Sequence, residues 1–278
     1  MKVAVIGAGM MGSGIAQTFA VHKDYEVILC DIRTEFAEKG RQTIGNNLLK
    51  LVEKGKMEQA DMDFALSRIS TGLNDVAAGG ELIIEAAMEQ MELKKKIFLE
   101  LHDQCSPDVI FTTNTSSLSV TELSAAVKRP IVGMHFFNPA PVMKLVEVVS
   151  GLNTPPWLIR QICDIARNIG KEPIQVKDSA GFVVNRILVP MINEAVGILT
   201  EGVASAEDID SAMKLGANFP MGPLALGDLV GLDICLSVME TLYNETLDGK
   251  YRPHPHLRTM VRAGLLGRKT GNGFYNYS

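Results

Sequence analysis

The sequence predicts an α/β protein, in which a doubly wound parallel sheet is followed by an all-α C-terminal domain. Short β-branched runs alternate with longer helical patterns from residue 2 to about residue 176, and this alternation is typical of strand–helix–strand units. Beyond Asp178 the strand signals stop and apolar residues recur at helical spacing. The chain has 278 residues, more than the roughly 100–200 residues of one typical domain, so we expect two domains.

Six segments of the first domain are strand candidates, because each is short, apolar and rich in β-branched residues. The helical segments between them would be the crossover helices of a parallel sheet. In 89–104, for example, Leu93, Ile97 and Leu101 fall at helical spacing and the charges are expected on the other face. The predicted strands are 2–6, 26–30, 81–85, 108–112, 131–134 and 144–149.

The region 36–69 departs from this alternation, since it is a long, charged helical stretch with Lys50, Lys54 and Lys56 near Gly55. It predicts a helical hairpin inserted into the first domain. Beyond the boundary, which lies near Ser179-Ala180-Gly181, helices are expected at 182–199, 206–215 and 231–244. The predicted domains are therefore 1–180 and 181–278.

Composition and charge exclude several classes of protein. The chain has 27 basic and 32 acidic residues, a net charge of −5, and lacks a basic block that could track a phosphate backbone, so nucleic acid is not an expected partner. The sequence has no apolar run of the ~18 residues that span a bilayer, and it begins at once with a strand pattern instead of a cleavable signal. We expect a cytoplasmic protein without a membrane partner.

The four cysteines are widely separated and form no C-x-x-C pair. That spacing argues against both a disulfide framework and a zinc site, so we expect reduced, buried, structurally ordinary thiols and no metal. The cysteines are Cys30, Cys105, Cys163 and Cys235.

A glycine-rich turn follows the first predicted strand and opens a helix. Gly7 permits a tight turn, Gly9 lets the backbone approach a pyrophosphate, and Gly12 lets helix and strand pack closely. In this context G-x-G-x-x-G is the fingerprint of a Rossmann-type dinucleotide site, where the phosphates lie on the helix N-terminus. We expect cofactor contacts along the whole turn, including Met10 and Met11.

Asp31 completes the fingerprint at the end of the next strand, about 20 residues on. Its carboxylate can accept hydrogen bonds from the ribose hydroxyls of NAD but would repel the 2′-phosphate of NADP. The sequence therefore favours NAD. Arg33 would soften that repulsion, so NADP stays the alternative.

Two polar segments follow later strands, at the edge of the sheet where such proteins bind ligands. Asn114-Thr115-Ser116-Ser117-Leu118-Ser119 can reach a ligand with its hydroxyls, although Ser117 and Ser119 could instead be helix caps. His135 opens His-Phe-Phe-Asn-Pro. A partly buried imidazole suits a general base, and a buried structural histidine is the alternative.

These motifs belong to six stretches that resemble the 3-hydroxyacyl-CoA dehydrogenase family over essentially the whole chain, most closely its short bacterial members that act on 3-hydroxybutyryl-CoA. The resemblance implies an NAD-dependent oxidoreductase that interconverts an (S)-3-hydroxyacyl-CoA and a 3-oxoacyl-CoA. The stretches are VAVIGAGMMGSGIA from Val3, NTSSLS from Asn114, GMHFFNPAPVMKLVEVV from Gly133, GFVVNRIL from Gly181, GANFPMGPLALGDLVGLD from Gly216 and GRKTGNGFYNY from Gly267.

The resemblance also implies the catalytic residues. His135 would exchange the proton of the 3-hydroxyl group, with Glu147 on the far imidazole nitrogen. Ser116 and Asn185 would hold the substrate oxygens. For Glu147 and Asn185 the alternatives are an edge-strand charge and an amide near a helix start.

Further residues follow from the same resemblance. Glu89, Lys94, Ser116 and Asn138 are placed around the cofactor, and Lys54 with Lys50 at the coenzyme A phosphates, although a charged helical hairpin would carry lysines in any case. The family also implies a homodimer built by the C-terminal helices, which would cover the acyl site.

Two other functions compete with this one. A 3-hydroxyisobutyrate or 6-phosphogluconate type of dehydrogenase also joins a glycine-rich domain to helices, but relies on a lysine in place of a His–Glu pair. A dinucleotide-binding sensor without turnover would not need the complete set Ser116, His135, Glu147 and Asn185.

Overall fold

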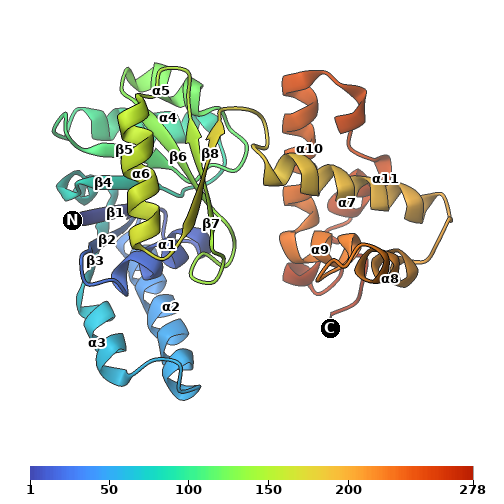
Figure 1. Cartoon of the computed structure of the whole chain (residues 1–278), viewed down its shortest axis with the longest axis horizontal. Helices are drawn as coiled ribbons and strands as arrows, with labels where there is room; N and C mark the ends of the chain where they lie inside the picture. The colour runs from blue at the N-terminus through green and yellow to red at the C-terminus, as the bar shows by residue number, and fades with distance from the viewer. Residues whose placement is uncertain (278) are drawn as a thin grey trace. The chain divides into compact units, whose positions relative to one another are not determined.

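The computed structural model describes residues 1–277 and contains two compact units, Met1–Asp178 and a second that begins at Ser179. The first unit holds one eight-stranded sheet, in the order β3-β2-β1-β4-β5-β6-β7-β8 (Figure 1). The strands are β1 Lys2–Ile6, β2 Glu26–Asp31, β3 Ile69–Leu73, β4 Leu82–Glu85, β5 Ile110–Thr113, β6 Ile131–Phe136, β7 Leu145–Ser150 and β8 Glu172–Lys177.

Helices cover both faces of this sheet, which confirms the doubly wound α/β class. Buried residues of α1, α2, α3 and α6 share one apolar core with the strands, for example Phe19, Leu48 and Ile162. Those of α4 and α5 lie outside that core, and these two helices pack against each other. The helices are α1 Met10–Ala20, α2 Thr34–Glu53, α3 Gln59–Ser67, α4 Met91–His102, α5 Val120–Val127 and α6 Pro156–Asn168, with a 3₁₀ helix at Asn74–Gly79.

The expectation of a wholly parallel sheet is wrong at one edge. Strand β7 runs antiparallel to β6, and β8 is parallel to β7. The physical reason is the short connection 137–144, which contains no helix, whereas a parallel crossover needs about a dozen residues or more. The remaining strand pairs are parallel, and the order reverses between β1 and β4.

Two strands at the edges of the sheet were not predicted. In β3 only Ile69 is buried, and β8 has no buried residue, so neither carries the apolar run by which the other strands are recognised. Helices α2 and α3 occupy the region of the expected hairpin, and they connect the parallel strands β2 and β3.

One face of α4 also differs from the sequence prediction. Ile97 and Leu101 face the core, but Lys94 lies beside them and is only 1% exposed. The charged residues of this helix are therefore not all on its outer face. The partner of this buried ammonium group is found in the candidate site.

The second unit is helical, and its described residues form isolated β-bridges but no strand. Its apolar core includes Ile192, Leu224 and Met239. Buried Asp210 accepts hydrogen bonds from the first backbone N–H groups of α9, at Leu224 and Ala225. The helices are α7 Val184–Thr200, α8 Ala206–Gly216, α9 Pro223–Val230, α10 Leu232–Thr246 and α11 Pro255–Arg262, with 3₁₀ helices at Gly249–Tyr251 and Arg268–Thr270.

Residues 1–277 contain neither a membrane-spanning helix nor a cluster of metal-ligand side chains. None of the helices in this range has the length and apolar character to cross a membrane. No group of three or more His, Cys, Asp or Glu side chains in the same range is arranged to hold a metal ion.

Candidate active site

The glycine-rich turn between β1 and α1 leaves room for a ligand at one position only. Gly7 has a φ of +93°, and a Cβ there would lie 2.6 Å from the Ala86 carbonyl oxygen. A Cβ at Gly12 would lie 1.7 Å from the carbonyl oxygen of Gly7, so no side chain fits between turn and helix. A Cβ at Gly9 would meet no atom within 4 Å. The backbone at Gly9, at the N-terminus of α1, therefore faces open space.

Asp31 closes one side of that space. Its carboxylate accepts hydrogen bonds from the backbone N–H groups of Ala8 and Ile32, both at 2.7 Å, which fix it beside the turn. A cleft of about 490 Å³ adjoins this carboxylate and continues along α2. It is lined by Ala8, Gly9, Met10, Ser13, Asp31, Phe36, Lys39, Gly40 and Thr43.

His135 and Glu147 form a buried pair across two antiparallel strands. They stand directly opposite each other in the register of β6 and β7, and opposite residues of an antiparallel pair point to the same face. The imidazole Nδ1 lies 2.7 Å from Glu147 Oε2. The histidine is 5% exposed and the glutamate is fully buried. Because β7 lies between β6 and β8, Glu147 is not an edge-strand charge.

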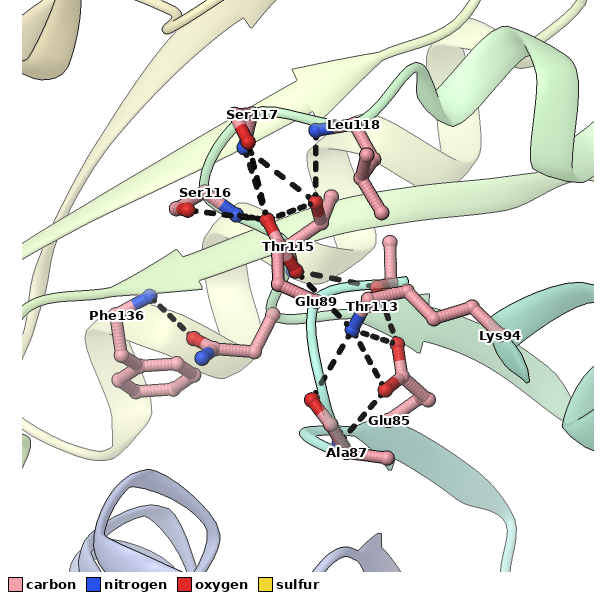
Figure 2. Close-up of polar contacts among 11 residues, drawn as sticks. Glu85, Ala87, Glu89, Lys94, Thr113, Thr115, Ser116, Ser117, Leu118 and Phe136 are labelled. Carbon is pink, nitrogen blue, oxygen red and sulfur yellow. Dashed lines mark hydrogen bonds and ion pairs between the residues drawn. The ribbon is translucent and has the colours of Figure 1, made fainter. Parts of the chain in front are cut away.

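The serine-rich segment is organised around one carboxylate oxygen, Glu89 Oε1 (Figure 2). This oxygen accepts hydrogen bonds from the hydroxyl of Thr115 at 2.7 Å, from the backbone N–H and hydroxyl of Ser116 at 2.7 and 3.0 Å, and from the backbone N–H of Ser117 at 3.1 Å. Burial alone would raise the pKa of Glu89, but the charge of Lys94 and the hydrogen bonds from Thr115 and Ser116 outweigh it and lower the pKa. Glu89 is therefore ionised at neutral pH.

A buried ion pair lies next to Glu89 (Figure 2). The ammonium group of Lys94 donates to both oxygens of Glu85, at 2.7 and 2.8 Å, and lies 3.3 Å from Glu89 Oε2. Glu85 is fully buried and also accepts from the Thr113 hydroxyl at 2.6 Å and the Ala87 backbone N–H at 2.7 Å. One lysine thus connects the end of β4 to the serine-rich segment that follows β5.

A hydrogen bond also connects the serine-rich segment to the strand that carries His135. The side-chain oxygen of Asn114 accepts from the backbone N–H of Phe136 at 2.8 Å (Figure 2). Strands β5 and β6 are parallel neighbours, so Ser116 and His135 both lie near the carboxyl edge of the sheet. Ser119, in contrast, is a helix cap, because its hydroxyl accepts from Glu122 N at the start of α5.

The connection between β6 and β7 carries Asn138, which is exposed and precedes Pro139. Lys171 fastens this connection, since its buried ammonium group donates to the carbonyl oxygens of Ala140 at 2.6 Å and Met143 at 2.8 Å. Burial lowers the pKa of Lys171. The lysine is thus a structural clamp on the segment beside the His–Glu pair.

The other predicted residues belong to other elements. Lys50 is exposed in the last turn of α2, and Lys54, also exposed, directly follows that helix. Met10 is 74% exposed at the start of α1, where Met11 is partly buried. Asn185 lies in the first turn of α7, in the second unit.

The sequence interpretation missed three residues of the polar cluster. Glu85 ends a strand that is otherwise entirely apolar, and a carboxylate in that position could have been recognised as a ligand-side group. Thr113 precedes the serine motif and Asn114 opens it, but neither side chain was given a role of its own. Their hydrogen bonds depend on the pairing of β4, β5 and β6, which local patterns do not specify.

The whole chain was compared with known protein families. Residues 2–179 match the NAD-binding domain of 3-hydroxyacyl-CoA dehydrogenase, and residues 181–277 match its C-terminal domain. The chain belongs to the 3-hydroxyacyl-CoA dehydrogenase family. These matches confirm the family predicted from the six motifs, and they identify NAD as the cofactor of this chain.

Individual members of the family are similar over their full length. A 3-hydroxybutyryl-CoA dehydrogenase of Clostridioides difficile is 53% identical, with 100% of each chain covered. The mitochondrial hydroxyacyl-coenzyme A dehydrogenase of Sus scrofa is 40% identical over 99% of this chain and 90% of its own. The crystal structure of (S)-3-hydroxybutyryl-CoA dehydrogenase from Ralstonia eutropha has a TM-score of 0.95 and 48% identity, covering 100% of this chain and 99% of that one.

The residues present fit NAD. The one glycine of the turn that faces open space, Gly9, lies at a helix N-terminus, where unsatisfied N–H groups attract a pyrophosphate. Asp31 borders the adjoining cleft and presents a carboxylate suited to ribose hydroxyls. The chemistry of the donors and the space in front of them therefore agree with the family.

Proposed function

We propose that this chain is an NAD-dependent dehydrogenase that interconverts an (S)-3-hydroxyacyl-CoA, foremost 3-hydroxybutyryl-CoA, and the corresponding 3-oxoacyl-CoA, acetoacetyl-CoA. The observation that carries the proposal is the buried pair of His135 Nδ1 and Glu147 Oε2 at 2.7 Å, in the same unit as the dinucleotide turn. The names of the relatives from Clostridioides difficile and Ralstonia eutropha support the short acyl chain.

His135 acts as the general acid and base. An ionised carboxylate can only accept, so Nδ1, which lies 2.7 Å from Glu147 Oε2, is the nitrogen that carries the proton of the neutral imidazole. Nε2 is then the basic nitrogen that takes the proton of the substrate 3-hydroxyl group. The imidazole becomes a cation in this step, and the adjacent buried carboxylate stabilises that cation. Bound NAD would supply the acceptor for the hydride of C3, beside the glycine turn and Asp31 that would hold it. In the direction of reduction, His135 returns the proton to the substrate oxygen.

Ser116 and Asn185 orient the substrate oxygens. The Ser116 hydroxyl donates to Glu89 at 3.0 Å, and a hydroxyl oxygen that donates its proton can also accept a hydrogen bond from a substrate hydroxyl group. Asn185 supplies an amide that can both donate and accept. Such fixed polar groups hold C3 in place for the reaction and reduce the entropic cost of reaching the transition state.

Two other properties belong to the proposal. We place the CoA phosphates at Lys54 and Lys50, which are exposed cations at one end of α2.

We also propose a cytoplasmic homodimer. The four cysteines are free, which suits a reducing compartment, and the second unit exposes large apolar side chains that a second subunit could cover. These include Ile187, Val203, Leu215 and Leu247.

The proposal is tested by following NADH oxidation with acetoacetyl-CoA as substrate. We expect rapid turnover, and a comparison of 3-oxoacyl-CoA substrates of increasing chain length should show the highest kcat/KM for short acyl groups. A purified protein that binds NADH but oxidises none with any 3-oxoacyl-CoA would refute the activity.

A further inference from the structure

The Glu85–Lys94–Glu89 cluster lies in a defined half of the dinucleotide site. Asp31 ends β2 and marks the adenosine half, on the β1–β2–β3 side of the sheet. The strand order reverses between β1 and β4, and a dinucleotide crosses the sheet at this point, so that its nicotinamide half lies over the β4–β5 side. Glu85 is the last residue of β4, and Glu89 contacts the segment that follows β5.

The cluster carries one net negative charge, because one ammonium group stands between two carboxylates. Lys95, the next cation along α4, does not add to it, since it pairs with Glu92 at 2.8 Å and Glu122 at 2.7 Å. The Glu89 side chain is 33% exposed, whereas Glu85 and Lys94 are buried. The net negative charge of the cluster therefore lies on Glu89, at the surface of the site.

We propose that this cluster sets the relative affinity of the enzyme for oxidised and reduced cofactor. The nicotinamide ring is a cation in NAD⁺ and neutral in NADH, so a net negative charge beside it stabilises NAD⁺ selectively. The inference rests on the proposed function, in that it requires the chain to bind NAD. It adds Glu85 to the site as a positioning residue.

Glu85 acts without touching a ligand. It is fully buried, and its oxygens are engaged by Lys94, Thr113 and the Ala87 backbone. Its charge neutralises Lys94, so that the charge of Glu89 is left over for the cofactor. A purely structural role for Glu85 would alter the affinity for both forms of the cofactor equally. An electrostatic role changes their ratio.

The test is calorimetric titration of the full-length protein with NAD⁺, NADH and ADP-ribose, which lacks the nicotinamide. The variants are Glu89→Gln and Glu85→Gln, which keep the shape of the side chain and remove its charge. Glu92→Gln is the matched control, because it removes an exposed carboxylate from α4, the helix that carries Lys94.

We expect the ratio Kd(NAD⁺)/Kd(NADH) to rise roughly three- to tenfold in Glu89→Gln, in keeping with the loss of one nearby charge at a partly screened site. Glu85→Gln should shift the ratio in the same direction. In Glu92→Gln the ratio should stay at the wild-type value, and the affinity for ADP-ribose should not change in any variant. Should Glu85→Gln fail to fold, Glu89→Gln still decides the question.

Equal weakening of NAD⁺ and NADH in Glu89→Gln, or an unchanged ratio, would overturn the inference and leave the proposed function standing. A wild-type protein that binds neither NAD⁺ nor NADH would overturn both. A shift of the same size in Glu92→Gln would show that the effect is not specific to the cluster, and would also overturn the inference.

Discussion

At the scale of single residues, the site depends on ionisable groups that are buried in pairs. His135 and Glu147 make one such pair and Lys94 and Glu85 another. Removing one member of a buried pair leaves the other charge without compensation, which costs far more than the loss of an exposed ion pair. Substitutions that preserve shape and hydrogen bonds but remove charge are therefore the informative ones.

The His–Glu pair should behave as one catalytic unit. His135→Gln keeps a similar volume but cannot exchange the proton, so kcat should fall by roughly 10²–10⁴ while the affinity for NADH stays close to that of the wild type. Glu147→Gln should also lose activity, because an amide still accepts the hydrogen bond but cannot stabilise the imidazolium. Steady-state kinetics and NADH titration check both.

The double variant tests the coupling between them. His135→Gln/Glu147→Gln should be little worse than His135→Gln alone, since residues that serve one proton transfer are not additive. Additive losses in log kcat would contradict the pair and would assign Glu147 to packing between β6 and β8.

Asp31 should determine the choice between NADH and NADPH. Its two oxygens are held by the backbone N–H groups of Ala8 and Ile32, so the carboxylate cannot turn away from a 2′-phosphate. Asp31→Ser should reduce the preference for NADH, measured as the ratio of kcat/KM values. Faster turnover of NADPH than of NADH by the wild type would contradict this role and point to Arg33.

At the scale of elements, two glycines of the turn between β1 and α1 have different roles: Gly12 is needed for folding and Gly9 for ligand binding. Gly12→Ala should lower the free energy of unfolding by roughly 3 kcal/mol or more, because its Cβ would collide with the carbonyl oxygen of Gly7. The free energy of unfolding of Gly9→Ala should lie within ~0.5 kcal/mol of the wild-type value. The φ of −68° at this position suits alanine, and the added Cβ would meet no atom within 4 Å.

The same two variants differ in ligand binding. Gly9→Ala should raise the Kd for NADH at least about tenfold, because the methyl group occupies the space through which the pyrophosphate approaches the backbone. Denaturant unfolding and NADH titration of each variant check the pair of predictions. A Gly9→Ala protein with wild-type affinity would show that the pyrophosphate does not contact this turn.

The C-terminal end of α2 should contact the nucleotide part of the substrate. Lys54→Ala should raise KM for acetoacetyl-CoA by roughly three- to tenfold and flatten its dependence on salt, because an exposed cation acts on the phosphates through a screened field. KM for acetoacetyl-N-acetylcysteamine, which lacks the phosphates, should hardly change. The control is Lys96→Ala, whose side chain is 72% exposed on α4. Equal losses with both substrates would contradict CoA binding by Lys54.

The elements also show where sequence reasoning succeeds. The strands β1, β2, β4, β5, β6 and β7 are largely buried and form short, mostly apolar, β-branched runs, so local patterns identified them. The edge strand β8 lacks that signal, and the antiparallel direction of β7 is set by the length of a connection. Lys94 resembled an exposed helix lysine, because its partner Glu85 is nine residues away in sequence, at the end of another element.

As with the strands, the parts of the candidate site that lie in local motifs were predictable from the sequence. The glycine turn, Asp31 and the serine segment follow from local motifs, and the likeness to the family supplied Glu147 and Asn185. Neither route predicted that Glu85 compensates Lys94, because that pairing exists only once β4 and α4 are packed together. Buried charge pairs are the part of a site that local patterns describe least well.

At the scale of the whole molecule, the two units have separate apolar cores. The cofactor turn, the His–Glu pair and the polar cluster all belong to the first unit, whereas Asn185 belongs to the second.

We expect two copies of the chain to form a dimer through the apolar side chains that the second unit exposes. Sedimentation velocity of the wild type at micromolar concentration should give twice the mass of the chain, because exposed apolar area of this kind is usually covered by a partner. The dimer should persist in the presence and absence of NADH. A single species with the mass of one chain would contradict the homodimer.

The His–Glu pair also helps to fix the register in which β6 and β7 pair. A slip of one residue would place Val146 or Val148 opposite His135 and turn Glu147 to the other face of the sheet. A fully buried carboxylate without its imidazole partner costs several kcal/mol. Misaligned hairpins are thus disfavoured by the same carboxylate that serves the proton transfer.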